Sequence, residues 1–572
     1  MTELDSSQRE VAEVEPETRQ IVLAGPGAGK SETVGALAAN LVATHKLYPE
    51  EILVISFSRA AVSVVRRRTE HVVDEGQGVR VRTIDSLAAS LVEELSDSPA
   101  PFKSYDDTVL QAIALMAAGD DVFGDIRHVI VDEVQDVVGV RAEFVLALLE
   151  ALPDDAGFTL LGDPLQSLYD FQLTDDHPMT SQQFLDSVRR RRNVAQRDLR
   201  GEYRSRTTVA GEMSRLRKEL EGLDPSRRRR RVETASADLS PLGELDEDAV
   251  ETIASWRGRT VLLCDTNARA ALAASALARH GVRAEAVAEA RDVSHPAWIA
   301  LALADHQHTR IERSEFMAVA EGAGCPDVDE AWRQMRTVAG AGSGVDIRTF
   351  ARQLAGLRGR DMFRRVPESP IVVSTVHRAK GLEFDNVVLV DSDDWSNDLG
   401  DAERMASMLY VAMSRGRDRV TKVDGIDVGR WRRAAYGDGE RPWVKRPFRA
   451  RGLLGVLMEP RMARAFGATG SGVTETLGAI VTWEETEPLI DEAGNEFPSW
   501  VASVDDEPIA RTGEHFGRFM ARECARGVIP RLNGGRVDGF ETALGEPRSE
   551  QPGRHGLWVA ARISGSVDLE WS

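Results

Sequence analysis

The sequence predicts an α/β fold made of two domains with parallel sheets, small helical insertions and a C-terminal β-containing module. Three observations predict this fold. A strand-like run at residues 18–25 enters a glycine-rich turn, and an apolar periodic stretch from Thr33 to Val42 follows, as in a helix. A second set of strand-like runs begins at Thr260. From about residue 446 the pattern changes to short β-like pieces among many glycines and prolines.

Length and composition indicate a folded protein of several domains. The chain has 572 residues, more than one hydrophobic core usually spans. Hydrophobic residues make up 42% and charged residues 28%, which argues against wholesale disorder. No apolar stretch reaches the roughly 18–20 residues that span a bilayer, and the first ten residues lack the pattern of a signal peptide. We therefore expect a cytoplasmic protein with no membrane contact.

Charge and cysteine usage exclude further classes. Lys plus Arg number 71 and Asp plus Glu 92, and a net charge of −21 argues against coating of nucleic acid by bulk charge. Arginine runs at 66–68, 189–192 and 227–231 either concentrate positive potential or form solvated faces. The cysteines are far apart, which leaves no zinc or iron–sulfur ligand set. They are Cys264, Cys325 and Cys524.

Further strand-like runs extend both predicted sheets, with helical patterns between them. In the first domain they are Ile52–Phe57, Val79–Thr83, Val129–Asp132 and Thr159–Gly162. In the second domain they are Thr260–Cys264, Ile371–Thr375 and Val387–Asp391. We predict a first domain at 1–195 with a short accessory insertion at about 89–127, a second domain at 196–285 and 367–445, a reduced helical insertion at 286–366, and a C-terminal module at 446–572.

Residues 24–31 (AGPGAGKS) follow a strand and open a helix, the context in which a Walker A loop binds phosphates. Glycines let backbone N–H groups converge on the phosphates, and the helix N-terminus adds positive potential. Lys30 would neutralise phosphate charge and Ser31 would bind Mg²⁺. The strict pattern has glycine where Ala24 stands, so an accidental turn is the alternative for this segment alone. The loop residues predicted to contact ATP are Gly25, Pro26, Gly27, Ala28, Gly29, Lys30 and Ser31.

Two acids stand at the end of the strand-like run that precedes residues 132–136 (DEVQD). At this place in an α/β fold, side chains face the ligand. Asp132 would hold Mg²⁺, and Glu133 would orient and deprotonate the attacking water. The alternative is an acidic helix N-cap. Together with the glycine-rich loop, these acids predict a P-loop ATPase that requires ATP and Mg²⁺.

The remaining motifs indicate which kind of ATPase this is. In chain order they are residues 4–10 (LDSSQRE), 56–61 (SFSRAA), 161–169 (LGDPLQSLY), 202–205 (EYRS), 375–384 (TVHRAKGLEF) and 409–415 (LYVAMSR). They resemble, in the same order, the Q motif and motifs Ia, III, IV, V and VI of superfamily 1 helicases of the UvrD/Rep type. The resemblance covers about residues 4–420 and implies two RecA-like P-loop domains.

The resemblance implies roles around the nucleotide. Gln8 would read the adenine edge and Tyr203 would stack on its face, while Glu383 would bind the ribose. Gln166 would sense the γ-phosphate. Arg204 and Arg415 would act as arginine fingers, which stabilise charge on the transferring phosphoryl group.

The resemblance also implies a path for single-stranded DNA. Aromatic side chains hold such strands by stacking on the bases. Phe171 is the candidate for this role, and an ordinary buried aromatic is the alternative. The residues predicted to contact DNA are Phe57, Thr83, Tyr169, Phe171, Thr375 and His377.

Some positions depart from the family pattern. Asp85 stands where histidine is typical and places a negative charge near the presumed DNA backbone. Gln172, Glu202 and Glu32 also replace the usual residues, but none of these changes removes an ATPase group. Both insertions are short, which puts strand separation in doubt more than translocation.

These observations predict an ATP-dependent translocase or helicase on single-stranded DNA or 3′-tailed duplex. The resemblance implies 3′→5′ travel and a role in DNA repair, replication restart or defence against foreign DNA. A translocase that strips proteins from DNA without unwinding is one alternative. Another is an ATP-dependent, DNA-bound switch or recruitment factor whose C-terminal module binds a protein partner.

Overall fold

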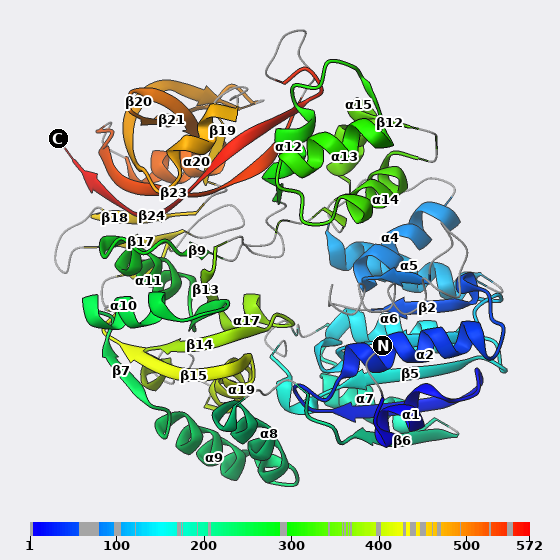
Figure 1. Cartoon of the computed structure of the whole chain (residues 1–572). Coiled ribbons are helices and arrows are strands. Elements are labelled where there is room, and N and C mark those ends of the chain that lie inside the picture. The colour runs from blue at the N-terminus through cyan, green and yellow to red at the C-terminus, as the bar shows by residue number, and fades with distance from the viewer. Residues whose placement is uncertain are drawn as a thin grey trace. The chain divides into compact units, whose positions relative to one another are not determined.

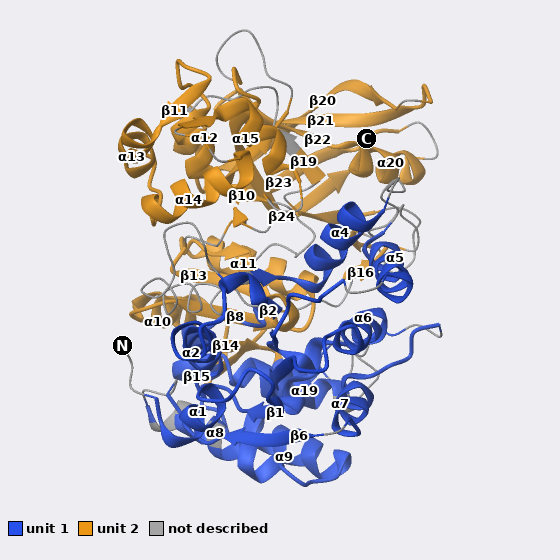
Figure 2. Ribbon diagram, turned by 90° about the vertical axis from the view of Figure 1, so that its right-hand side faces the viewer, with its two compact units in different colours: residues 1–240, 379–387, 392–421 blue, residues 241–378, 388–391, 422–572 orange. Residues whose placement is uncertain are grey.

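The computed structural model divides the chain into two compact units (Figure 2). Unit 1 comprises residues 1–240, 379–387 and 392–421, and unit 2 comprises residues 241–378, 388–391 and 422–572. The structure describes residues 4–55, 79–96, 104–119, 122–168, 173, 176–191, 193–203, 207–286, 294–340, 342, 344–356, 359, 362–363, 365, 369–395, 402–426, 431–434, 442–446, 453–459, 462–465, 471–491, 493–524, 528–545 and 553–571.

The first sheet is parallel, with the strand order β3-β2-β4-β5-β1-β6. Its central strands are buried along their whole length, because helices cover both faces of such a sheet. The predicted strands of the first domain are confirmed. The strands are β1 (Arg19–Ala24), β2 (Ile52–Ile55), β3 (Arg80–Arg82), β4 (His128–Val131), β5 (Gly157–Gly162) and β6 (Val194–Leu199). The sequence does not predict β6, because its polar composition (VAQRDL) suits an exposed edge strand.

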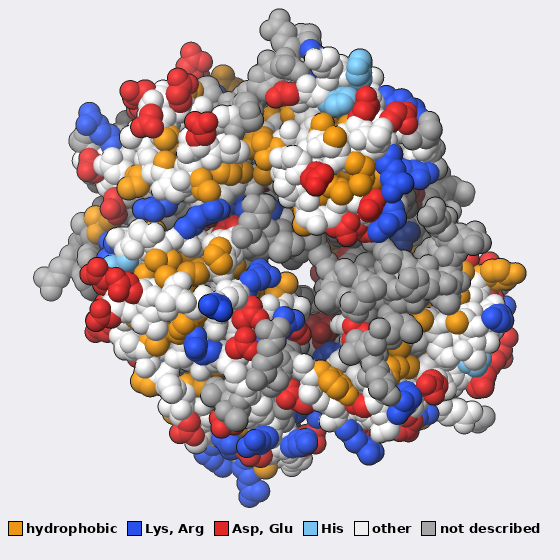
Figure 3. Space-filling model, viewed as in Figure 1, with side chains coloured by type: hydrophobic (Ala, Val, Ile, Leu, Met, Phe, Trp, Pro, Cys, Tyr) orange, Lys and Arg blue, Asp and Glu red, His pale blue; other side chains and the backbone are white. Residues whose placement is uncertain are grey.

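Unit 1 also contains helices, which Figure 1 labels. They are α1 (Ser6–Ala12), α2 (Lys30–Ala43), α4 (Ile84–Leu95), α5 (Tyr105–Ala118), α6 (Gly139–Glu150), α7 (Ser181–Arg189), α8 (Thr208–Leu220), α9 (Pro225–Ala237) and α19 (Ala402–Met413). Short 3-10 turns are η1 (Pro49–Glu51), η2 (Val134–Asp136) and η3 (Pro164–Gln166). The arginine run 227–231 lies on α9, and basic side chains gather there at the lower edge of Figure 3. Several of them pair with acids, such as Arg229 with Glu233 at 2.7 Å.

The second sheet has the strand order β7-β15-β14-β8-β13-β9. Its pairs β8–β13, β9–β13 and β7–β15 are parallel, and the three predicted strands of the second domain are confirmed. The division between the units passes through β14 and β15. The elements are β7 (Pro241–Glu244), α10 (Glu247–Ser255), β8 (Thr260–Cys264), α11 (Asn267–Arg279), β9 (Glu285–Ala286), β13 (Ile371–Thr375), α17 (Val376–Ala379), β14 (Phe384–Val390), η5 (Ser392–Asp394) and β15 (Gly416–Asp424).

The insertion in the second domain is largely helical, as predicted. An aromatic cluster holds it together: Trp298 lies 6.3 Å from Phe316, which lies 5.3 Å from Trp332. The elements are β10 (His295–Pro296), α12 (Ala297–Leu303), β11 (Arg310–Glu312), α13 (Arg313–Gly322), α14 (Val328–Ala339), β12 (Gly344–Asp346) and α15 (Ile347–Leu354).

The C-terminal module forms an antiparallel sheet with the strand order β16-β17-β18-β24-β23-β20-β21-β22-β19. The expectation of only short strands is wrong, because β23 and β24 are 14 residues long. The elements are β16 (Trp431–Arg433), β17 (Trp443–Lys445), β18 (Gly455–Met458), β19 (Ala463–Ala465), η7 (Ser471–Thr476), β20 (Ile480–Ile490), β21 (Glu496–Val504), β22 (Glu507–Thr512), α20 (Glu514–Glu523), β23 (Arg531–Leu544) and β24 (Leu557–Glu570).

The helical insertion and the C-terminal sheet share one hydrophobic core. Strand β10 of the insertion pairs with β23, and Thr542 of β23 accepts a hydrogen bond from the backbone N of Ala300 in α12 at 3.0 Å. These two parts of unit 2 therefore form one packed body. The predicted domain boundaries stay a prediction. In the described part of the chain, no helix is long and apolar enough to cross a membrane.

Candidate active site

The glycine-rich loop connects β1 to α2, as the sequence predicts. Gly27 and Gly29 have φ angles of 76° and 78°, a left-handed conformation that favours glycine. A Cβ on Gly29 would lie 2.3 Å from Nε2 of Gln8, so this position also has no room for a side chain. Lys30, the first residue of α2, donates from Nζ to the carbonyl of Ala24 at 3.4 Å.

The acidic pair follows β4 directly. Asp132 is buried and accepts a hydrogen bond from the backbone N of Glu133 at 2.9 Å. Glu133 has a φ of 56° and a ψ of 45°, a conformation that costs a non-glycine residue about 1–3 kcal/mol and persists mainly at functional sites. Its Oε2 lies 3.6 Å from Nζ of Lys30. The loop lysine and the second acid therefore face one another.

Glu133 is kept ionised by its neighbours. Burial by itself would raise the pKa of this carboxyl. The nearby Lys30 charge and a 2.5 Å hydrogen bond from Gln135 outweigh burial, and more distant cations add to them, so the pKa of Glu133 falls to about 2. The more distant cations are Lys380 and Arg415.

Gln166 accepts hydrogen bonds from two further cations of the site, Arg415 and Lys380. Its Oε1 accepts from Nη2 of Arg415 at 2.5 Å, and its carbonyl accepts from Nζ of Lys380, also at 2.5 Å. Lys380 pairs in addition with Asp136. Burial, reinforced by Glu133 and opposed by Lys380, raises the pKa of Asp136 to about 6. All of these residues belong to unit 1.

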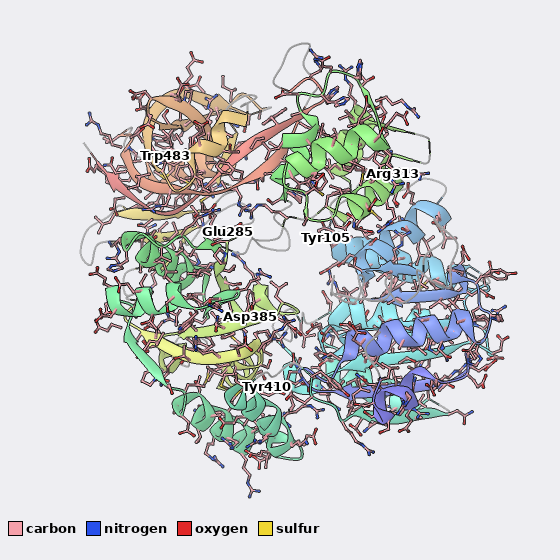
Figure 4. All side chains as sticks on the ribbon, in the orientation of Figure 1. Tyr105, Glu285, Arg313, Asp385, Tyr410 and Trp483 are labelled. Carbon is pink, nitrogen blue, oxygen red and sulfur yellow. The ribbon has the colours of Figure 1, made fainter. Side chains whose placement is uncertain are left out.

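Asp163 is fully buried and is hydrogen-bonded to Gln166. It accepts hydrogen bonds from Nε2 of Gln166 at 2.9 Å, from the backbone N of Leu165 at 3.2 Å and from the hydroxyl of Tyr410 at 3.4 Å. Tyr410 is labelled in Figure 4 and lies on α19, five residues before Arg415. Burial and the nearby carboxylate raise the pKa of Tyr410 well above its usual value. This network fixes the position of Gln166.

Gln8 and Tyr203 both lie beside Gly29 of the loop. Nε2 of Gln8 donates to the carbonyl of Ala28 at 3.4 Å, and the backbone N of Tyr203 donates to the carbonyl of Gly27 at 2.8 Å. The hydroxyl of Tyr203 donates to Asp5 at 2.5 Å, a bond that raises the pKa of Tyr203 to about 12. The Tyr203 side chain is 53% exposed, so a planar group could still stack on its ring.

Glu383 lies in unit 1 and accepts two hydrogen bonds from Arg417, at 3.1 Å from Nε and at 2.5 Å from Nη2. Among the residues predicted to contact DNA, Thr83 lies in unit 1 and caps α4, while Thr375 and His377 lie in unit 2. The other predicted site residues lie outside the described residues. These are Phe57, Tyr169, Phe171 and Arg204.

The negative charge expected at Asp85 is paired. Oδ1 of Asp85 lies 2.8 Å from Nη2 of Arg141 in α6, and Arg141 also reaches Asp106 in α5 at 3.1 Å. The pairing reduces the charge that Asp85 presents next to Thr83.

Sequence reasoning missed several residues that the structure adds to the site. Asp136, Asp163, Lys380 and Tyr410 all lie inside segments that resemble motifs, so a polar residue in the interior of such a segment was the available signal. No comparable signal marks Arg417, which lies just after the last motif.

Ser31 and Asp132 offer oxygen ligands of the kind that Mg²⁺ prefers. Within the described ranges, no group of three or more His, Cys, Asp and Glu residues could hold a metal ion by itself. Mg²⁺ in nucleotide sites is bound by one or two protein oxygens together with the phosphates, so the donor set fits.

Comparison with known proteins defines the class. A family model described as an AAA domain matches residues 8–172, and one described as a UvrD-like helicase C-terminal domain matches residues 370–421. No curated protein matches the chain. Among solved structures, a chain of a complex of an S. cerevisiae Dbp5 variant with Nup159, a Gle1 variant, IP6 and ADP is 9% identical with a TM-score of 0.33. The match covers 73% of this chain and 83% of that chain, and a TM-score this low supports no conclusion.

The loop, the acidic pair and the converging cations define a P-loop ATPase site. The two family models support a helicase ATPase of the UvrD/Rep-type superfamily 1 kind. The fold agrees, since two parallel sheets with helices precede an antiparallel C-terminal sheet.

Proposed function

We propose that the chain is an ATP-driven motor that moves along single-stranded DNA in the 3′→5′ direction. The observation that carries the proposal is the convergence of Lys30, Glu133, Gln166 and Arg415 at one site. A phosphate-neutralising lysine, an ionised carboxylate and an arginine held by a glutamine are the parts that hydrolysis of ATP requires.

Each residue has a role in the proposed reaction, and that of Arg204 rests on the resemblance alone. Lys30 and the loop N–H groups hold the phosphates, and Ser31 and Asp132 hold Mg²⁺, which would neutralise charge that develops during transfer. Glu133 is ionised and accepts the proton of the attacking water. Arg415, oriented by Gln166, stabilises the transferring phosphoryl group together with Arg204.

The nucleoside is held at the other end of the loop. Gln8 reads the adenine edge, Tyr203 stacks on its face, and Glu383 binds the ribose. The exposed ring of Tyr203 and its hydrogen bond to Asp5 support this assignment, because the bond orients the ring while leaving one face accessible.

The DNA strand is bound by stacking and by polar contacts that do not read sequence. The residues proposed for it are Phe57, Thr83, Tyr169, Phe171, Thr375 and His377. Hydrolysis changes the grip on the strand in each cycle, and repeated cycles produce movement. Repair, replication restart and defence against foreign DNA are the processes that use such a motor.

A second function is an ATP-dependent, DNA-bound recruitment factor with little unwinding. The shared core of the helical insertion and the C-terminal sheet favours it, because it gives the insertion a structural role within the C-terminal body. In this case the C-terminal sheet would bind the protein partner.

Turnover and strand-separation assays decide between these functions. The motor predicts ATP hydrolysis that single-stranded DNA stimulates and that Glu133→Gln abolishes. A fluorescent duplex with a 3′ tail should then be separated, and its 5′-tailed counterpart should not. Stimulated turnover without separation of either substrate would fit a motor that translocates without unwinding, or the recruitment factor. Turnover that DNA does not stimulate contradicts the motor.

A further inference from the structure

Arg217 brings another cation to the glycine-rich loop. It lies on α8, which follows the segment that resembles motif IV, and belongs to unit 1 (Figure 1). Its side chain is 14% exposed. A Cβ on Gly25 would lie 2.4 Å from Cδ and 2.8 Å from Nε of Arg217. The absence of a side chain at Gly25 is therefore what allows Arg217 to lie against the loop.

Arg217 lies beside the part of the loop that would hold the phosphates. Gly25 follows Ala24, whose carbonyl accepts from Nζ of Lys30, and Lys30 faces Glu133. Nε of Arg217 also lies 3.7 Å from Oδ1 of Asp163, the carboxylate that holds Gln166. The guanidinium therefore lies beside Gly25 and Asp163, near the residues proposed to hold the terminal phosphate and the water.

Asp163 forms an ion pair with Arg217 at 3.7 Å but accepts no hydrogen bond from it within the described residues. Its two oxygens already accept hydrogen bonds from Leu165, Gln166 and Tyr410. Nε of Arg217 is buried and has no hydrogen-bond partner among the described residues. On the same guanidinium, Nη1 donates to Glu221 one turn later at 2.5 Å. A buried donor without an acceptor costs stability, so a bound group that supplies an acceptor would be favoured at this place.

We propose that Arg217 binds the terminal phosphate of the nucleoside triphosphate and so distinguishes ATP from ADP. A planar guanidinium binds phosphate oxygens through two parallel hydrogen bonds, and Nε of Arg217 already lies beside the loop at Gly25. Glu221 keeps the side chain extended when no triphosphate is bound. The inference rests on the proposed ATPase function, and it adds a residue outside the segments that resemble known motifs.

Equilibrium binding to the full chain tests the proposal without hydrolysis or DNA. The dissociation constants of a non-hydrolysable ATP analogue and of ADP are measured by competition with a fluorescent nucleotide. Arg217→Ala should weaken the ATP analogue by roughly 10- to 100-fold and leave ADP nearly unchanged. Arg217→Lys should retain part of the preference. Lys218→Ala, an exposed cation on the same helix, is the matched control and should bind both nucleotides as the wild type does.

Two results would overturn the proposal. One is an unchanged ratio of the two constants in Arg217→Ala. The other is an equal loss for both nucleotides, which would mean that Arg217 only supports the loop. Arg217→Gln keeps the stem beside Gly25 and removes the charge, so it gives the same test if the alanine variant does not fold. If the proposed motor function is wrong, turnover will not respond to DNA. The ratio of the two dissociation constants would still test the role of Arg217, because it is measured without DNA.

Discussion

Two features of Glu133 are unfavourable for folding. Its backbone is held in a left-handed conformation that favours glycine, and its carboxylate is buried, both of which cost folding free energy. Lys30 and Gln135 offset the second cost by favouring the charged form. With a pKa of about 2, the carboxylate stays ionised at neutral and mildly acidic pH. An acid-side loss of activity must therefore come from another group.

Asp136 is that group, since its pKa of about 6 lies inside the working range. As the pH falls through 6, Asp136 takes up a proton and Lys380 loses its charged partner. We expect ATP turnover to fall on the acid side with an apparent pKa near 6. A pH profile of the maximal rate checks this. Asp136→Asn, at whatever lower rate it retains, should lack the inflection, and an unchanged inflection in that variant would assign it to a different residue.

The site residues that sequence reasoning identified are those that act through residue type and local order. Lys30 follows the loop after β1, and Glu133 follows β4 closely. A short local sequence pattern is therefore enough to identify each of them. Lys380 and Asp163 could not be assigned this way, because their roles depend on partners that are distant in sequence. Lys380 meets Asp136 across 244 positions, and Tyr410 meets Asp163 across 247.

At the scale of elements, the first sheet is anchored at the start of β4 by a buried polar network. Nδ1 of His128 contacts the carbonyl of Pro16 at 2.7 Å, and Nε2 contacts Oγ1 of Thr159 at 2.9 Å. Gln20 donates to the same hydroxyl at 3.0 Å. Burial lowers the pKa of His128 to about 4, so the ring is neutral in the folded protein.

This network predicts a loss of stability in acid. The unfolded chain binds a proton at His128 below its ordinary pKa of 6.5, while the folded chain does so only near 4. Stability is therefore present above pH 6.5 and is lost as the pH falls through this window, by about 2 kcal/mol between pH 7 and pH 5. Denaturant unfolding of the wild type and of His128→Gln checks this. An equal change with pH in both proteins would refute the role of His128.

The elements differ in how far the sequence predicts them. The loop between β1 and α2 is specified locally by glycines with positive φ, and its prediction is confirmed. Strand β23 is not predictable as one long strand, because Gly534 and Gly535 lie inside it and read as a turn. Their φ angles are 102° and 85°, and the register with β24 shifts between Gly534 and Arg536. The glycines make a bulge in a continuous strand.

At the scale of the whole molecule, a buried ionic cluster connects three parts of unit 2. Arg562 of β24 lies 2.8 Å from Glu541 and 3.8 Å from Asp538, both on β23. Ser294, before β10, donates to Glu541 at 2.5 Å. Arg365 pairs with Glu285 of β9, which is labelled in Figure 4. No local sequence pattern could reveal this cluster, because the strand pairing that builds it joins residues about 250 positions apart.

Removal of Arg562 should destabilise unit 2 selectively. In Arg562→Ala, the buried carboxylate of Asp538 and the partly buried carboxylate of Glu541 lose their cation, which costs on the order of 3–5 kcal/mol. Hydrogen exchange should increase together in β10, α12, β23 and β24, and stay unchanged in the first sheet. The control is Arg313→Ala, because Arg313 and its partner Asp329 are exposed and such pairs contribute about 0–1 kcal/mol. Faster exchange in β23 alone would show that the insertion and the C-terminal sheet are not one body.

DNA-stimulated ATP hydrolysis tests the motor most directly, with the wild type and Glu133→Gln compared on single-stranded DNA. Wild-type turnover should rise with DNA, and the variant should lose at least about 100-fold of it while still binding ATP, because only the acceptor of the water's proton is removed. Wild-type turnover without any response to DNA, or a Glu133→Gln variant that turns over like the wild type, would contradict the proposed motor.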